Sequence, residues 1–230
     1  MKITTGLVLG AFVATLNANA ALIVPAAAET QMGANSIQTS GYFRPGAQYF
    51  YGAEHFSGPV VINGFSFRMA VGSGLEGNTG VQNFQVSLST TSATATGLNI
   101  VTPALNHGGD LTLVRNSPLD ILSVGILNGD GVTDWAPSIN FDTPFVYDPA
   151  DGNLLMEFGG TMPNGIFTTR FIDGWEVDGA GLARVTPLTG GFISDQLGIV
   201  ALFDTTPIPE PGSLLFLSFA AGLGLGRRRR

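Results

Sequence analysis

The sequence has no cysteine, and its only lysine is Lys2. Without cysteine the chain forms no disulfides, so a domain exported from the cell would have to rely on its hydrophobic core for stability. Between Glu29 and Thr206 only five arginines stand against sixteen aspartates and glutamates. We therefore expect no binding to nucleic acid, because such binding requires clustered cations.

Residues suited to catalysis are also scarce. The two histidines are His55 and His107, and no G-x-S-x-G turn presents a nucleophilic serine. A catalytic zinc usually takes two or three histidines among its ligands. Carboxylates such as Glu157 and Glu176 are numerous, but their spacing selects no acid and base pair for glycoside hydrolysis. We expect the histidines in loops and the carboxylates on a solvated acidic surface. We also expect no enzymatic activity. An uncharacterised secreted hydrolase is the third of three functions considered, after the two given at the end of this section.

The N-terminal end has the pattern of a secretory signal. Lys2 supplies a charged start, the apolar run from Ile3 to Leu16 follows, and Ala18-Asn19-Ala20 is a small-x-small cleavage site. A second cleavage site lies after Ala28, and the sequence leaves the choice open. We predict a signal peptide with a signal helix within residues 1–28. A transmembrane anchor fits less well, because the apolar run is short.

The C-terminal end combines three features in order. Pro209, Glu210 and Pro211 precede an apolar run, Gly212 to Gly226, and the chain ends in a basic cluster of Arg227, Arg228, Arg229 and Arg230. As a helix rising ~1.5 Å per residue the run covers roughly 22 Å, so we predict a short transmembrane helix. The arginines favour a cytoplasmic end, which leaves the remainder of the chain across the membrane. The prolines keep Glu210 extended, outside the helix.

The stretch Ile208 to Leu215, the apolar span and the arginine cluster together resemble the PEP-CTERM sorting signal of exported bacterial proteins. That family more often has valine where this chain has Ile208. The resemblance implies export across the inner membrane, with a signal peptidase acting at the N-terminus. It also implies transient anchoring in the membrane, cleavage near the motif by an exosortase, and transfer to the cell surface or the extracellular space.

The body of the chain also resembles one found in uncharacterised exported proteins with the same tail. That family has no assigned activity, so the resemblance implies a β-rich exported body. The stretches that carry it are Phe65-Ser66-Phe67-Arg68, Val86-Ser87-Leu88-Ser89-Thr90-Thr91, Thr143-Pro144-Phe145-Val146-Tyr147-Asp148-Pro149 and Gly152-Asn153-Leu154-Leu155-Met156-Glu157.

The region from Glu29 to Thr206 is long enough for one domain and carries a β pattern. Glycine and proline interrupt it frequently, and apolar residues alternate in Gly64 to Met69 and in Phe84 to Ser89. Tyr147 to Asn153 is the clearest turn. We predict an all-β fold: an antiparallel β-sandwich, jelly-roll-like, over residues 29–206, followed by the sorting segment 207–230. Further predicted strands are Leu111 to Arg115, Ile121 to Val124, Ile139 to Phe141, Leu154 to Phe158, Phe167 to Ile172 and Leu197 to Phe203.

Two ligand hypotheses remain. Asn128, Asp130 and Asp134 surround a glycine turn, as ligands of Ca²⁺ do, although the same residues also make a good turn without metal. Trp135 and Trp175 lie among aspartate and glycine and could stack on sugars, and the aromatic stretch Tyr42 to Tyr51 is a further candidate; the alternative is that these rings fill the core.

The predicted function is therefore that of a non-enzymatic protein of the cell surface or extracellular matrix, associated with exopolysaccharide or biofilm. The alternative is a lectin-like module that binds extracellular polysaccharide.

Overall fold

The protein folds into antiparallel sheets. The computed structural model describes residues 20–33, 35–38, 45–71, 81–119, 128–161, 171–176 and 181–209. In these residues regular structure consists of strands and three short 3₁₀ helices, η1 (Ala26–Glu29), η3 (Ala53–His55) and η4 (Pro103–Asn106). The predicted all-β, antiparallel body is confirmed. The predicted signal helix and C-terminal helix lie outside the described residues, and no described helix is long and apolar enough to span a membrane.

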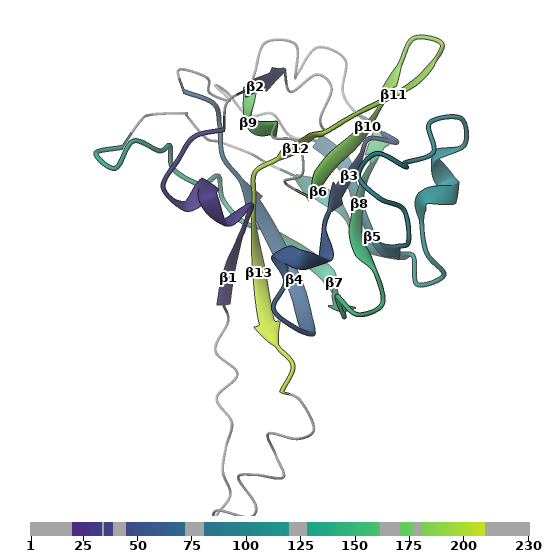
Figure 1. Ribbon diagram of the computed structural model, residues 1–230, viewed down its shortest axis with the longest axis horizontal. Helices are drawn as coiled ribbons and strands as arrows, with labels where there is room; N and C mark the ends of the chain where they lie inside the picture. The colour runs from purple at the N-terminus through teal and green to yellow at the C-terminus, as the bar shows by residue number, and fades with distance from the viewer. Residues whose placement is uncertain are drawn as a thin grey trace, which may run out of the picture.

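Two sheets form the body, with a small third sheet at one end (Figure 1). The four-stranded sheet has the order β1 (Ala20–Val24), β13 (Ala201–Pro207), β4 (Val60–Phe67) and β7 (Ile139–Tyr147). The six-stranded sheet has the order β11 (Gly191–Asp195), β10 (Leu182–Leu188), β3 (Gln48–Tyr51), β8 (Asn153–Thr161), β5 (Val81–Thr91) and β6 (Thr112–Leu119). The third sheet contains β12 (Leu197–Ile199), β9 (Phe171–Glu176) and β2 (Asn35–Gln38).

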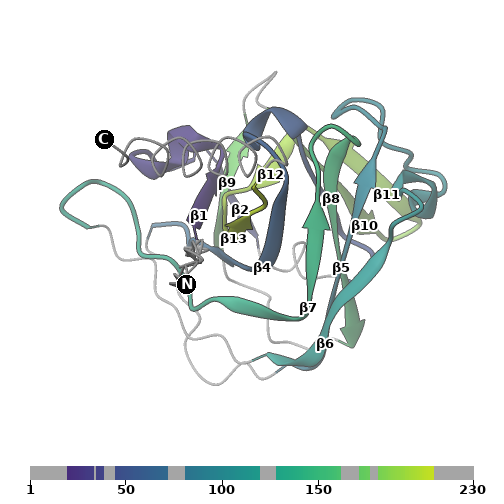
Figure 2. The same ribbon diagram turned by 90° about the horizontal axis from the view of Figure 1, so that it is seen from below.

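The main core lies between the two large sheets, which form separate layers in Figure 2. Side chains alternate along each strand, so every second residue of a strand enters the core. In β5 these residues are Phe84, Val86 and Leu88, as predicted. Phe65 of β4 stacks on Phe158 of β8 with ring centroids 5.9 Å apart, which joins the layers across the core. The arrangement is sandwich-like.

Eight of the strands pair as a long hairpin would. Counting β1, β3 to β8 and β13, the first pairs with the last, the second with the seventh, the third with the sixth and the fourth with the fifth. The predicted turn from Tyr147 to Asn153 carries the chain from β7 in one sheet to β8 in the other. It is closed by a 3.0 Å hydrogen bond from the Asp151 amide to the Asp148 carbonyl and a 2.8 Å bond from the Tyr147 hydroxyl to the Gly152 carbonyl.

The remaining predicted strands have mixed outcomes. Leu154 to Phe158 lies in β8, and Ile139 to Phe141 begins β7. The stretch Leu197 to Phe203 is two strands rather than one, because its halves join different sheets: β12 pairs with β9, and β13 pairs with β1 and β4. The Val200 amide between them still donates to β9, at the Asp173 carbonyl, at 3.1 Å. Ile121 to Val124 lies outside the described residues.

A long loop, residues 92–111, covers the outer face of the six-stranded sheet. Leu98 of the loop joins a second apolar cluster with Phe50 and Leu155 from the sheet. Asp110, near the end of the loop, accepts hydrogen bonds from the Thr90 amide at 2.9 and 3.0 Å and from the Thr90 hydroxyl at 3.0 Å. The outer face of this sheet therefore carries buried side chains beneath the loop.

Candidate functional site

A cluster of polar side chains lies beneath the 92–111 loop. Gln48 of β3, Ser89 of β5 and Glu157 of β8 alternate with core residues and so point to the outer face of the sheet. The β3–β8 register places Gln48 opposite Glu157. His107, directly after η4, reaches the same place from the loop. We call these four residues the polar clip.

Hydrogen bonds join every member of the polar clip. His107 Nδ1 lies 2.8 Å from Ser89 Oγ, and His107 Nε2 lies 2.8 Å from Glu157 Oε2. Gln48 Nε2 donates to the same Glu157 oxygen at 2.6 Å, and Gln48 Oε1 accepts from Asn106 Nδ2 at 2.8 Å. Since an ionised carboxylate only accepts, Nε2 of His107 carries a hydrogen. At Nδ1 the ring accepts from the Ser89 hydroxyl in its neutral form and donates to it in its charged form.

The electrostatics of Glu157 follow from these bonds. Burial of the carboxyl opposes ionisation, but the hydrogen bonds from His107 and Gln48 and the charge of His107 outweigh it and hold the pKa of Glu157 below its ordinary value. The ionised form is therefore the one that the surrounding groups stabilise.

Serine, histidine and a carboxylate in a row are also the components of a hydrolase triad. In the polar clip, however, Ser89 has no exposed surface, whereas a nucleophile must reach the substrate carbonyl. In the described conformation the chemistry available is therefore hydrogen bonding that fastens the loop to the sheet. His107 lies in a loop, as the sequence predicts, but its partners were not predicted. The available signal was Glu157, a carboxylate within the apolar run Leu154 to Phe158; Ser89 follows the ordinary alternation of β5 and gives no such signal.

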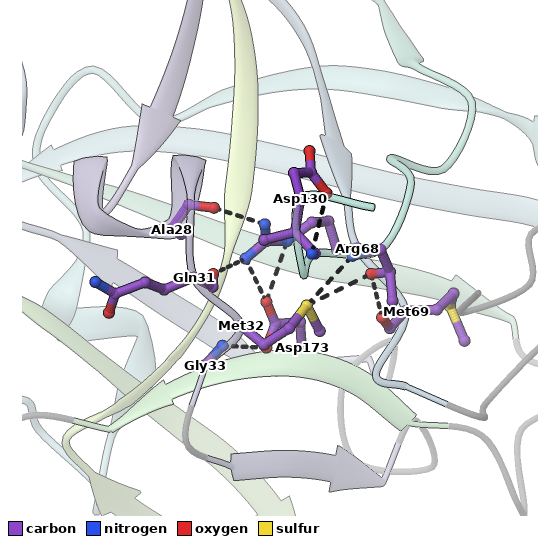
Figure 3. Close-up of polar contacts among 10 residues, drawn as sticks. Ala28, Gln31, Met32, Gly33, Arg68, Met69, Asp130 and Asp173 are labelled. Atoms are coloured by element: carbon purple, nitrogen blue, oxygen red, sulfur yellow. Dashed lines mark hydrogen bonds and ion pairs between the residues drawn. The ribbon is translucent and has the colours of Figure 1, made fainter. Parts of the chain in front are cut away.

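A second polar cluster surrounds Arg68, just after β4 (Figure 3). Arg68 is fully buried, and its Nη2 and Nε donate to Asp173 Oδ2 of β9 at 2.6 and 3.1 Å. Nη1 donates to the Ala28 carbonyl at 2.6 Å and Nη2 to the Gln31 carbonyl at 2.8 Å, while the Gly33 amide donates to Asp173 Oδ1 at 2.8 Å. The cluster ties the N-terminal segment to both neighbouring strands.

The pKa of Asp173 is set by opposing effects. Burial raises the pKa of Asp173 above its ordinary value, and the guanidinium of Arg68 together with the Gly33 amide counteracts part of that rise. Arg68 and Asp173 thus form a buried salt bridge in which each charge stabilises the other in place of water.

The predicted sugar-stacking residues lie in different surroundings. Trp135 is half-buried, and Arg68 Cζ lies 5.1 Å from its ring centroid, so one face of this ring is covered by a buried cation. Trp175 of β9 is half-buried and packs against the main core. In the Tyr42 to Tyr51 stretch, Tyr49, Phe50 and Tyr51 are buried, because β3 is a central strand with both faces covered, and these three rings offer no platform for a sugar. Residues 42–44 lie outside the described residues.

The predicted calcium loop is closed by its own hydrogen bonds. Asn128 Nδ2 donates to Asp134 Oδ1 at 2.8 Å, and Asp130 Oδ1 accepts from the Val132 amide at 3.2 Å. Gly131 has a φ of 87°, a conformation that favours glycine. Within the described part of the chain, no group of three or more acidic, histidine or cysteine side chains is placed to hold a metal ion. Turn chemistry accounts for the motif, and calcium binding here stays a prediction.

The predicted sorting motif begins directly where the sheet ends. β13 ends at Pro207, and the Ile208 amide donates to the Pro59 carbonyl at 3.0 Å. Pro209 is exposed. Glu210, Pro211 and the basic cluster Arg227 to Arg230 lie outside the described residues.

A shallow hollow of about 340 Å³ lies on the outer face of the six-stranded sheet, beside the 92–111 loop. Its lining includes Phe50, Glu54, Thr94, Asn153 and Gln196. Phe50 is only 3% exposed, so the hollow presents polar groups without an aromatic platform for a sugar ring.

Comparison of the chain with models of protein families, with curated proteins and with solved structures yields no match.

Proposed function

We propose that this chain is an exported, non-enzymatic protein of the bacterial cell surface or extracellular matrix, delivered by its PEP-CTERM-like tail. The observation that best supports the proposal is the pairing of β1 with β13. These strands run antiparallel with Ala20 opposite Thr205, so the chain enters and leaves the domain at the same end (Figure 1). A domain with a signal sequence before it and a sorting segment after it would thus present both attachments to the membrane on one side.

We further infer that the body is a jelly-roll-like sandwich. The pairing of eight strands as a hairpin rolled into two sheets, in the orders β1-β13-β4-β7 and β3-β8-β5-β6, is the support for this architecture. The strands β9 to β12 are then an insertion between the seventh and eighth strands. This architecture carries many functions, so it supports a scaffold and does not specify a ligand.

The polar groups of the body favour a structural role. The charged and hydrogen-bonding side chains of the polar clip and of the Arg68 cluster bind one another and the backbone. Catalysis would instead require an exposed nucleophile or acid and base pair beside a cavity.

In this proposal an exosortase cleaves near Pro209 to Pro211, after a signal peptidase has removed the N-terminal segment. Exposed Pro209 supports access to the motif, and two prolines keep its backbone extended. Ile208 alone separates the motif from the end of β13, so the enzyme would act against the folded domain.

The proposal is tested by intact-mass spectrometry of the full chain in a bacterium that has an exosortase. We expect the surface-released protein to end near Pro209 to Gly212. A Glu210→Ala variant should keep Arg230 and stay in the membrane fraction, whereas Glu176→Ala, which removes an exposed carboxylate in β9, should be processed normally. Released protein that retains Arg230 would overturn the processing, and cytoplasmic protein that retains Met1 would overturn the export.

A further inference from the structure

We propose that the signal peptide is cleaved between Ala20 and Ala21, and that residues 21–28 remain as part of the mature domain. This inference rests on the proposed export. The sequence alone leaves cleavage after Ala20 and cleavage after Ala28 as equal alternatives; the packing of β1 and η1 distinguishes them.

The place of β1 in the four-stranded sheet favours cleavage after Ala20. All five of its residues pair with β13, from Ala20 opposite Thr205 to Val24 opposite Ala201. Val24 is fully buried and Leu22 packs against the main core. Cleavage after Ala28 would remove this strand and leave β13 as an unprotected sheet edge, whose free amides and carbonyls invite pairing with other chains.

The contact between η1 and Arg68 favours the same bond. Ala28 is fully buried, and its carbonyl accepts the 2.6 Å hydrogen bond from Arg68 Nη1 (Figure 3). Cleavage after Ala28 would remove this carbonyl from the mature protein. A buried guanidinium would then lose one of its partners, which is costly in a site that water does not reach.

Distance from the apolar run also distinguishes the two bonds. A signal peptidase reads small residues that follow the h-region closely. The run ends at Leu16, so Ala18 and Ala20 come shortly after it, whereas Ala26 and Ala28 come after the residues that form β1. The enzyme acts on the chain as it emerges, so the folded domain does not block the second bond. The fold shows instead that cleavage after Ala20 removes one residue of β1, whereas cleavage after Ala28 removes the whole strand.

Cleavage is hydrolysis of the Ala20–Ala21 peptide bond. Water supplies a hydroxyl to the Ala20 carbonyl, which leaves as a carboxylate with the signal peptide, and the Ala21 nitrogen becomes a free ammonium. Ala21 pairs with Asp204 across the sheet, and both line a shallow hollow of about 310 Å³ with Ser66 and Asn140. The new positive charge thus arises opposite a carboxylate, and opposite charges on paired strands stabilise a sheet.

The test is the N-terminal sequence of the exported full-length protein, together with two matched substitutions at the third residue before each bond. We expect wild-type protein to begin at Ala21. Ala18→Phe should accumulate uncleaved precursor, because a bulky residue replaces a small one in the recognition site. Ala26→Phe makes the same change at an exposed position and should leave the N-terminus at Ala21.

The outcomes separate this inference from the proposed export. A mature protein that begins at Glu29, or cleavage that Ala26→Phe blocks and Ala18→Phe does not, would overturn the inference and leave export standing. Protein that keeps Met1 in every fraction would overturn both.

A deletion provides a second measurement. When residues 21–28 are deleted from the exported chain, we expect loss of folded protein or a melting temperature lower by more than about 5 °C. An unchanged melting temperature would show that β1 and η1 are dispensable, against the inference.

Discussion

Removing the carboxylate of Asp173 should be among the most damaging single changes to the folded body. Asp173→Ala takes away the acceptor of two hydrogen bonds from Arg68 and one from the Gly33 amide. Arg68 has no exposed surface, so water cannot replace the lost partner. A guanidinium remains charged at any accessible pH, and the folded state would have to carry an unpaired buried cation.

The expected magnitude follows from this burial. The side chains of Arg68 and Asp173 are each 1% exposed, and breaking such a pair by removing one partner costs about 3–5 kcal/mol in the free energy of unfolding. For a domain of this size that corresponds to a melting temperature lower by roughly 6–20 °C. The double variant Arg68→Met, Asp173→Leu removes both charges and should recover much of the loss, because an apolar pair can replace a buried ion pair.

Urea unfolding of the purified protein, monitored by circular dichroism, measures these differences. The control is Asp195→Ala, which breaks the Arg184–Asp195 salt bridge between β10 and β11. Asp195 is 36% exposed in that pair, and an ion pair in contact with water contributes at most about 1 kcal/mol. The reasoning fails if Asp173→Ala loses no more stability than Asp195→Ala, or if the double variant is less stable than Asp173→Ala alone.

Two further predictions concern pH and calcium. The pKa of Glu157 is lower in the folded protein than in the unfolded chain, so the stability from this group is complete above the unfolded pKa and is lost as pH falls through the folded pKa. Wild-type protein should melt higher than Glu157→Gln near neutral pH, and the difference should shrink as pH falls below the unfolded pKa of about 4.3. A difference independent of pH would contradict the role of His107 and Gln48. One oxygen each of Asp130 and Asp134 already accepts an internal hydrogen bond that closes the turn without metal, so we expect melting temperatures in calcium and in chelator to agree. A calcium-dependent rise that Asp130→Asn abolishes would restore the metal hypothesis.

Local patterns predicted the parts of the fold that depend on neighbouring residues. The alternation in Phe84 to Ser89 indicates a strand with one apolar face, and β5 has that face in the core. The turn from Tyr147 to Asn153 was identified because proline, aspartate and glycine restrict the backbone over a few residues. Both signals are complete within a short stretch of sequence.

Contacts between distant residues could not be predicted in the same way. Arg68 alternates with Phe67 and Met69, so the strand pattern places it on the solvent side of β4. In the structure the segment from Ala28 to Gly33 covers that side, and the carboxylate partner Asp173 lies 105 residues away. His107 has two such partners: Ser89 lies 18 residues away in the sequence, and Glu157 lies 50 residues away. No periodicity links such positions.

The first strand of the domain could not be predicted from the sequence for a different reason. Ala20 to Val24 is short and apolar, and it continues a region with the composition of a signal peptide. Its identity as a strand depends on β13, which supplies all of its sheet partners from the other end of the chain. The hydroxyl of Thr205 donates to the Ala20 carbonyl across a separation of 185 residues.

This separation constrains the order in which the protein can fold. β13 lies between β1 and β4, so the four-stranded sheet lacks an interior strand until residues 201–207 are available. Along the proposed export route these residues cross the membrane last, just ahead of the apolar run that stays in it. The sheet would therefore close while the tail is still anchored, and β13 would hold Pro209 at the edge of a completed domain. A processing enzyme that cleaves after folding then meets a motif already fixed in position at one end, whereas one that cleaves earlier would release a chain whose four-stranded sheet is still open.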